Sequence, residues 1–207
     1  MNGPARWIAT IAIALVAYFG VKSLRQSATD RLPTEAEVTE KVDGMRNAAS
    51  AANPNLSKSD ALREYANKQS AEKLSKQDAT NQTQTATSMF FGFYFVNTRA
   101  RFDYCANRGV DITPFVSAFQ KKYAGQYALA TSNAKSFNFD PQTIISVGGH
   151  ELAKMAEQDM KDIAASVQIP ESETCAWFNA NAVEVANLIV LPPQVARSLN
   201  ARNAVHE

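Results

Sequence analysis

The sequence predicts an all-α protein in three parts: an N-terminal transmembrane helix, a partly helical stalk, and a bundle of four to five helices with one disulfide. Three features support this: an uncharged apolar run near the start, a polar region after it, and apolar residues at helical spacing in the second half. We assign residues 1–24 to the membrane anchor, 25–88 to the stalk and 89–207 to the globular domain. A chain of 207 residues has room for one ordinary domain besides these segments.

The predicted anchor centres on residues 7–21, which are mostly apolar and carry no charge. At about 1.5 Å per residue this run covers roughly 22 Å, less than the hydrocarbon core of about 30 Å. Lys22 and Arg25 can reach the interface with their long side chains, and Trp7 and Tyr18 are of the residue types that favour it. We therefore expect residues 7–24 to hold the chain in a membrane.

A cleaved signal peptide is the alternative interpretation of this segment, and it would leave a secreted protein. The single basic Arg6 before an apolar run of this length fits a signal peptide. The end of the run fits less well, because the nearest small-x-small candidates, at 21–23 and 26–28, have unsuitable residues in or around them. The sequence favours the retained anchor.

The predicted stalk, residues 25–88, is rich in polar residues and holds basic and acidic side chains in equal number. Two helical pieces are expected, over 34–52 and 59–76. Thr34 and Glu37 have the spacing of a capping box, and Pro54 separates the two pieces. Because apolar residues are sparse, we interpret the region as a solvated spacer. Its balanced charges argue against a polybasic lipid-binding segment.

The globular domain begins at an abrupt change of composition at Met89. Apolar residues at intervals of three and four predict a central helix that ends at the turn 107–109. Prolines and capping residues mark the starts of the remaining helices. The second helix is expected to begin at Thr113, and the third at Asp140 with a bend or new start at Gly148–Gly149. The fourth is expected to begin after Pro170 and to end at Leu191, and a short last helix follows over 194–202.

The two cysteines, Cys105 and Cys175, each lie at one end of a predicted helix and on its apolar face. Antiparallel packing of the two helices would bring the sulfurs together, and a disulfide would close a loop of about 70 residues. Two unrelated buried thiols are the alternative, because free cysteine is among the most buried residue types. We favour the disulfide, which forms and persists in oxidising compartments such as the bacterial periplasm.

An aromatic cluster between Phe90 and Phe95 is the most unusual composition in the chain. A helix that is apolar around most of its circumference must be buried on nearly all sides, which predicts the central helix of the bundle. The alternative is that one face projects to receive a ligand or partner, with arginines at its rim. That candidate binding surface consists of Phe90, Phe93, Tyr94, Arg99 and Arg101.

The sequence contains no catalytic, metal or cofactor motif. His150–Glu151 begins like the zinc motif H-E-x-x-H, but Lys154 stands where the second histidine is required. We therefore predict no catalytic residue, no metal ligand and no cofactor. The net charge of +1, from 21 basic and 20 acidic residues, gives no electrostatic reason to bind nucleic acid.

These features predict a non-enzymatic protein anchored in the inner membrane of a bacterium, with its helical domain in the periplasm. An anchor and stalk hold a binding surface near the membrane, so we expect an envelope protein as partner and a role as assembly factor, chaperone or accessory subunit. One alternative is a small-molecule or lipid sensor with a pocket lined by Phe91, Phe95, Phe119 and Tyr123. Another is an enzyme of unidentified type around His150, which would need a concave site with converging acidic groups.

Overall fold

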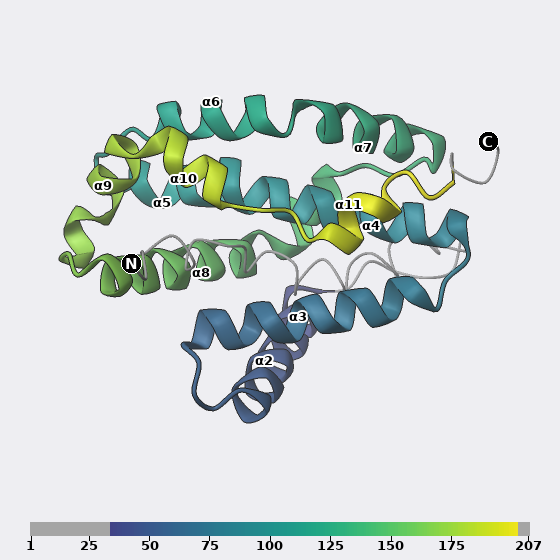
Figure 1. The fold of residues 1–207 in the computed structure, drawn as a ribbon, viewed down its shortest axis with the longest axis horizontal. Coiled ribbons are helices and arrows are strands. Elements are labelled where there is room, and N and C mark those ends of the chain that lie inside the picture. The colour runs from purple at the N-terminus through teal and green to yellow at the C-terminus, as the bar shows by residue number, and fades with distance from the viewer. Residues whose placement is uncertain (1–33, 203–207) are drawn as a thin grey trace.

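The computed structural model describes residues 34–202, and within this range the chain is all-helical, as predicted (Figure 1). The predicted anchor over residues 1–24 lies outside the described residues. No helix within 34–202 is long and apolar enough to cross a membrane. The elements are α2 (Glu35–Ala52), α3 (Lys58–Ser75), α4 (Ala79–Phe95), the π-helical η2 (Val96–Ala100), α5 (Arg101–Ala106), α6 (Thr113–Lys122), α7 (Ala124–Ser136), α8 (Gln142–Val167), the 3-10 turn η3 (Glu171–Glu173), α9 (Thr174–Ala180), α10 (Ala182–Leu188) and α11 (Pro193–Ser198).

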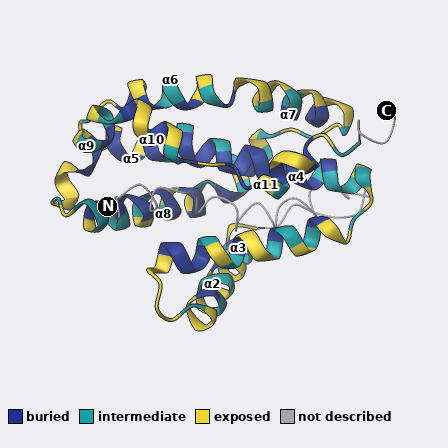
Figure 2. Cartoon of the chain, viewed as in Figure 1, coloured by how far each residue is buried: buried dark blue, intermediate teal, exposed yellow. Residues whose placement is uncertain are grey.

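The continuous rod formed by α4, η2 and α5 is the centre of the bundle. α7, α8 and α11 all pack on α4, and α8 also packs on η2 and α5. In Figure 1, α6 and α7 lie along the top, α8 lies below the rod, and the α2–α3 hairpin lies at the bottom. Figure 2 shows that α4 is buried around most of its circumference, which confirms it as the central helix.

The α2–α3 hairpin differs from the solvated spacer that the sequence predicts for this region. The capping box at Thr34 and Glu37 is present, and it starts α2 as expected. However, α2 packs on α8, and α3 packs on α4 and α11. The few apolar side chains of the hairpin are enough for this, because most of the larger ones face the bundle and are buried. The buried apolar residues include Val38, Val42, Ala49, Ala61, Leu62, Ala66 and Leu74.

Helix α4 begins at Ala79, well before the expected domain boundary at residue 89. Asp78 caps it by accepting a hydrogen bond from the backbone N–H of Asn81 at 2.9 Å. The polar residues of its first half are mostly buried from Thr83 onward, and Thr87 satisfies its hydroxyl by donating to the carbonyl of Thr83 at 2.7 Å. Composition therefore misplaced the start of this helix, because polar threonines that bond to their own backbone can line a buried helix.

The third predicted helix is continuous through Gly148–Gly149, and the fourth is not continuous to Leu191. α8 runs from Gln142 to Val167 without the expected bend or new start. The predicted helix after Pro170 is instead divided into η3, α9 and α10, with a break at Asn181. At the break, Asn181 leaves the helical conformation with φ −110° and ψ 26°, and its side chain donates to the carbonyl of Trp177 at 2.8 Å beside its own backbone N–H.

The disulfide between Cys105 and Cys175 is present, with the two Cα atoms 5.6 Å apart. Both cysteines are buried, and the bond joins the end of α5 to the start of α9. This confirms the pairing predicted from the positions of the cysteines at helix ends.

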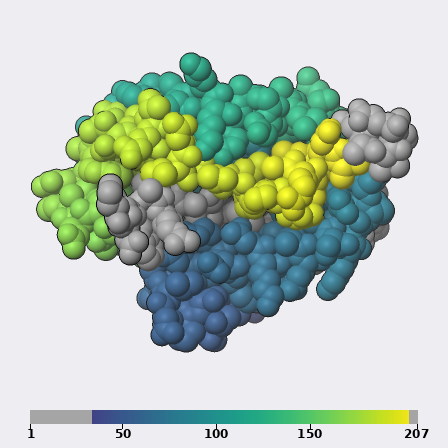
Figure 3. All heavy atoms as spheres, in the orientation of Figure 1, coloured from purple at the N-terminus to yellow at the C-terminus, as the bar shows by residue number. Residues whose placement is uncertain are grey.

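Two side chains at the end of α6 fix the segment that follows α10. Lys122 donates to the carbonyls of Ala186, Asn187 and Ile189 at 3.1, 2.8 and 2.7 Å, and so satisfies free carbonyls at the end of that helix. The hydroxyl of Tyr123 donates to the carbonyl of Ile189 and accepts from the backbone N–H of Leu191. From there the chain reaches α11, which Figure 3 shows in yellow on the surface between the α6–α7 layer and α3.

Replacing Tyr123 by phenylalanine is expected to lower the free energy of unfolding by about 1–3 kcal/mol. The change leaves the buried N–H of Leu191 without a partner, whereas the carbonyl of Ile189 keeps its bond from Lys122, and an unpaired buried group costs more than the bond itself contributes. Urea unfolding measures the change. Tyr127→Phe is the matched control on the neighbouring, partly exposed tyrosine, and we expect it to cost less than about 0.5 kcal/mol. Equal costs for the two variants would contradict this role of Tyr123.

Candidate functional site

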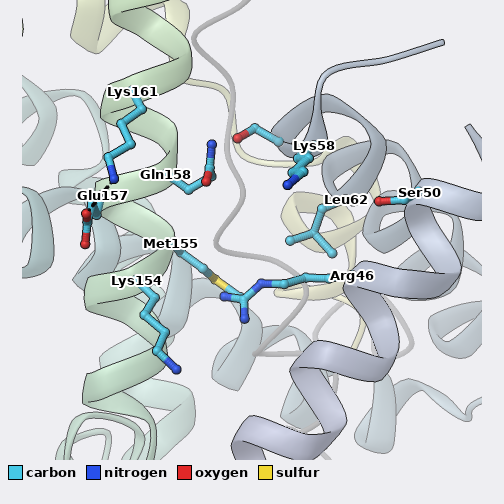
Figure 4. A pocket seen from close by; sticks show the side chains of 10 residues that line it. Arg46, Ser50, Lys58, Leu62, Lys154, Met155, Glu157, Gln158 and Lys161 are labelled. Atoms are coloured by element: carbon cyan, nitrogen blue, oxygen red, sulfur yellow. Dashed lines mark hydrogen bonds and ion pairs between the residues drawn. The ribbon is translucent and has the colours of Figure 1, made fainter. Parts of the chain in front are cut away.

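A cleft lies between α8 and the α2–α3 hairpin, with a volume of about 320 Å³. Volumes of this size lie at the lower end of those of ligand pockets. Figure 4 shows α8 on one side and the two hairpin helices on the other, with Arg46 and Met155 pointing toward each other across the gap. The lining residues are Arg46, Ser50, Lys58, Ser59, Leu62, Lys154, Met155, Glu157, Gln158 and Lys161.

The charge of this lining is mainly positive, because it contains four basic side chains and one carboxylate. Lys161 pairs with that carboxylate, Glu157, at 2.7 Å, and this pair lowers the pKa of Glu157. Arg46 pairs with the exposed Asp43 at 2.7 Å. Lys58, at the exposed N-terminus of α3, makes no ion pair with any residue in the range 34–202. The basic groups therefore outnumber the acidic partners that line the cleft.

The base of the cleft is joined to α2 through Glu151, whose side chain has no exposed surface. Its carboxylate accepts hydrogen bonds from Thr39 at 3.0 Å and from Lys154 at 2.9 Å. Arg46 Nη2 lies 3.1 Å from Glu151 Oε2, an ion pair without the alignment of a hydrogen bond. A buried carboxylate on α8 thus binds two residues of α2 and holds the guanidinium of Arg46 at the cleft.

Replacing Glu151 by glutamine is expected to loosen α2 locally and to cost about 1–2 kcal/mol. The cost stays moderate because Arg46 and Lys154 are both partly exposed and can turn toward water once the carboxylate charge is gone. Hydrogen exchange followed by mass spectrometry measures this, and α2 should lose protection while α6 keeps it. A uniform loss of protection across all helices would contradict a local role.

The floor of the cleft is partly apolar, with Leu62 from α3 and Met155 from α8. Ser59 also lines the cleft and is 95% buried, since its relative exposure is 5%. Its backbone N–H donates to Asp162 at 3.3 Å, whereas its hydroxyl has no hydrogen-bond partner in the described part of the chain. An apolar floor, a free hydroxyl and a basic rim together suit a ligand with an anionic group and a short apolar portion.

A second concavity of about 490 Å³ lies on the other side of α8 and contains His150. Asp103 and Glu157 also line it, so acidic groups and the histidine share one hollow. However, the lowered pKa of Glu157, caused by its pairing with Lys161, keeps this carboxylate ionised. A general acid at neutral pH requires a raised carboxyl pKa. Glu157 is therefore not suited to act as a general acid at neutral pH.

The predicted binding surface on the central helix is not a surface in the structure. Phe90, Phe93 and Arg101 have no exposed area, and Tyr94 is half-buried. Only Arg99 is exposed, and it lines the second concavity. The cluster is buried because helices pack on several sides of α4, as its nearly continuous apolar circumference requires.

The aromatic pocket of the sensor alternative is filled by its own side chains. Phe91 stacks on Phe95 with ring centroids 5.9 Å apart, and Phe119 lies 4.7 Å from Tyr123. All four side chains are buried. This packing counts against a ligand cavity among them.

Local sequence patterns gave no signal for the cleft, whose basic residues come from α2, α3 and α8. In the sequence, Arg46 and the three lysines each look like an ordinary solvated charge. Within the residues described, no group of three or more histidine, cysteine, aspartate or glutamate side chains is arranged to hold a metal ion. Comparison of the chain with family models, with curated proteins and with solved structures gave no match.

Proposed function

We propose that this chain is a non-enzymatic, membrane-anchored protein whose helical domain lies in the periplasm and binds another envelope protein. In this role it acts as an assembly factor, chaperone or accessory subunit of an envelope complex. The observation that supports the proposal is the buried disulfide between Cys105 and Cys175. Structural disulfides persist in oxidising compartments and are rare in the cytosol, where thiols are kept reduced.

The packing of α2 on α8 adds to this support. If residues 7–24 span the membrane, about ten residues separate that span from α2, a reach of at most roughly 35 Å even when extended. The domain would then stay close to the membrane surface instead of standing off on a long stalk. A position of this kind suits a protein that contacts the extramembrane parts of a membrane complex.

Mass spectrometry of the full-length protein from its native membrane, alkylated without reduction, tests the location and the anchor together. We expect an intact N-terminus and a mass that shows Cys105 bonded to Cys175. Two alkylated cysteines would overturn the periplasmic location, and a mass that lacks the apolar segment would show a cleaved signal peptide.

Crosslinking in intact cells then tests the protein partner. A photo-crosslinking residue at the exposed Val183 or Val190 positions should trap a specific envelope protein. The matched control places the same residue at Phe90, which is buried and should give no intermolecular product. Identical products from exposed and buried positions would show nonspecific reaction and count against the proposal.

A further inference from the structure

The basic residues of the cleft converge although they are far apart in the sequence. Arg46 comes from α2, Lys58 from the N-terminus of α3, and Lys154 and Lys161 from α8. The amino end of the long helix α3 adds a partial positive charge of its own at the same place. Against these stand Glu157 in the lining, the buried Glu151 beneath it, Asp43, which pairs with Arg46, and Asp162, which accepts the N–H of Ser59. Within the lining itself, four basic groups face a single carboxylate.

We propose that this cleft binds the phosphate head group of an anionic phospholipid. Arg46 and Lys58 hold the phosphate oxygens by charge-assisted hydrogen bonds, and the free hydroxyl of Ser59 adds one more donor. Leu62 and Met155 contact the first carbons of the acyl chains or the glycerol. The volume of about 320 Å³ accommodates a head group and not a whole lipid, so the rest of the chains remains outside.

Two observations favour a lipid over an acidic peptide as the occupant. The cleft has an apolar floor with Leu62 and Met155, which can contact the carbon atoms of a lipid, whereas an acidic segment would use only the basic rim. The cleft is also built on the first two helices after the proposed anchor, within reach of the membrane surface. The lipid as source of the phosphate relies on the anchor proposed above, but the chemistry of the cleft does not.

The test uses the full-length chain in a non-ionic detergent, titrated with short-chain phosphatidylglycerol and followed by calorimetry. Phosphatidylcholine of the same chain length is the ligand control, because it carries the same phosphate without net charge. We expect saturable binding of one phosphatidylglycerol per chain, at least about tenfold tighter than phosphatidylcholine. Equal affinity for the two lipids would overturn the proposal.

Two variants test the cleft itself. Lys58→Glu reverses an exposed charge at its rim, and Ser50→Trp blocks it sterically from an exposed position without a change of charge. Each should weaken binding of phosphatidylglycerol by on the order of tenfold. The matched control is Lys68→Glu, an exposed lysine on the same helix that lies outside the cleft lining, and it should change the affinity less than twofold. An equal loss in Lys58→Glu and Lys68→Glu would indicate diffuse adsorption and overturn the site.

Two further ligands distinguish the source of the anion. Glycerol phosphate carries the head group without acyl chains, and we expect it to bind at least tenfold more weakly than the lipid. Equal binding of the two would show that the ligand is a free phosphate compound and not a lipid. Displacement of the lipid by an octaglutamate peptide at equimolar concentration would show that the ligand is an acidic protein segment.

This experiment and the test of the proposed function can fail separately. Lipid binding in detergent does not depend on whether the N-terminal segment is retained or cleaved in the cell. Conversely, an intact anchored protein with its disulfide formed can still fail to bind phosphatidylglycerol. Thermal unfolding followed by circular dichroism confirms that each variant is folded before its affinity is interpreted.

Discussion

Removal of the Cys105–Cys175 disulfide is expected to lower the free energy of unfolding by about 4 kcal/mol. The bond joins residues 70 positions apart, and opening it restores conformational entropy to the unfolded chain. Urea unfolding of the wild type and of the double variant Cys105→Ala/Cys175→Ala measures the loss. Alanine is preferred to serine because both positions are buried, and a buried hydroxyl without a partner would add a cost of its own.

Reductant provides the internal control for this prediction. It should destabilise the wild type by a similar amount and leave the double variant unchanged, because the variant has no bond to reduce. A wild type that is equally stable with and without reductant would show that the two sulfurs are not bonded under those conditions. That result would also remove the main support for a periplasmic location.

Breaking the ion pair between Arg101 and Asp159 is expected to cost about 3–5 kcal/mol. Arg101 is completely buried, pairs with Asp159 of α8, and donates to the amide oxygen of Asn97 in η2 at 2.6 Å. Burial lowers the pKa of Arg101 to about 9, so the guanidinium is still charged at neutral pH. Asp159→Asn leaves that charge buried without a counterion, which is the costly case. Urea unfolding at pH 7 measures the cost.

A matched control on the same helix distinguishes the effect of burying a charge pair from the effect of pairing alone. Glu157→Gln removes the exposed pair with Lys161 and should cost less than about 1 kcal/mol. The double variant Arg101→Met/Asp159→Leu removes both buried charges and should be less destabilising than Asp159→Asn alone. If Asp159→Asn costs no more than Glu157→Gln, the buried pair does not contribute as inferred here.

The π-helical segment η2 explains how this buried arginine is positioned. The side-chain amide of Asn97 donates to the carbonyl of Phe93 at 2.7 Å and accepts a hydrogen bond from Arg101. These two bonds connect the π-helical turn to α4 before it and to α5 after it. Arg101 was predicted as a rim residue of a binding surface, since an arginine next to an aromatic run usually reaches solvent. The counterion that makes burial of this arginine tolerable is Asp159, which lies 58 residues later on a packed helix.

The signals that predicted the fold correctly are short in range. The capping box at Thr34, the aromatic run of α4 and the cysteines at helix ends each depend on residues within a few turns of one another. The signals that failed were also local. Two glycines suggested a bend in α8, but the helix is continuous there because its buried side chains on both sides of the pair pack against the rest of the bundle.

The sequence by itself determined that the described chain is helical, that α4 is the central helix, and that Cys105 pairs with Cys175. Periodicity and end signals suffice for this because they act along one helix. Only the tertiary structure decided that the α2–α3 hairpin packs on the bundle and that basic side chains from three helices meet in one cleft. The bond from Thr39 to Glu151 spans 112 positions, and no local pattern specifies such a contact, because it depends on which faces the packed helices turn toward each other.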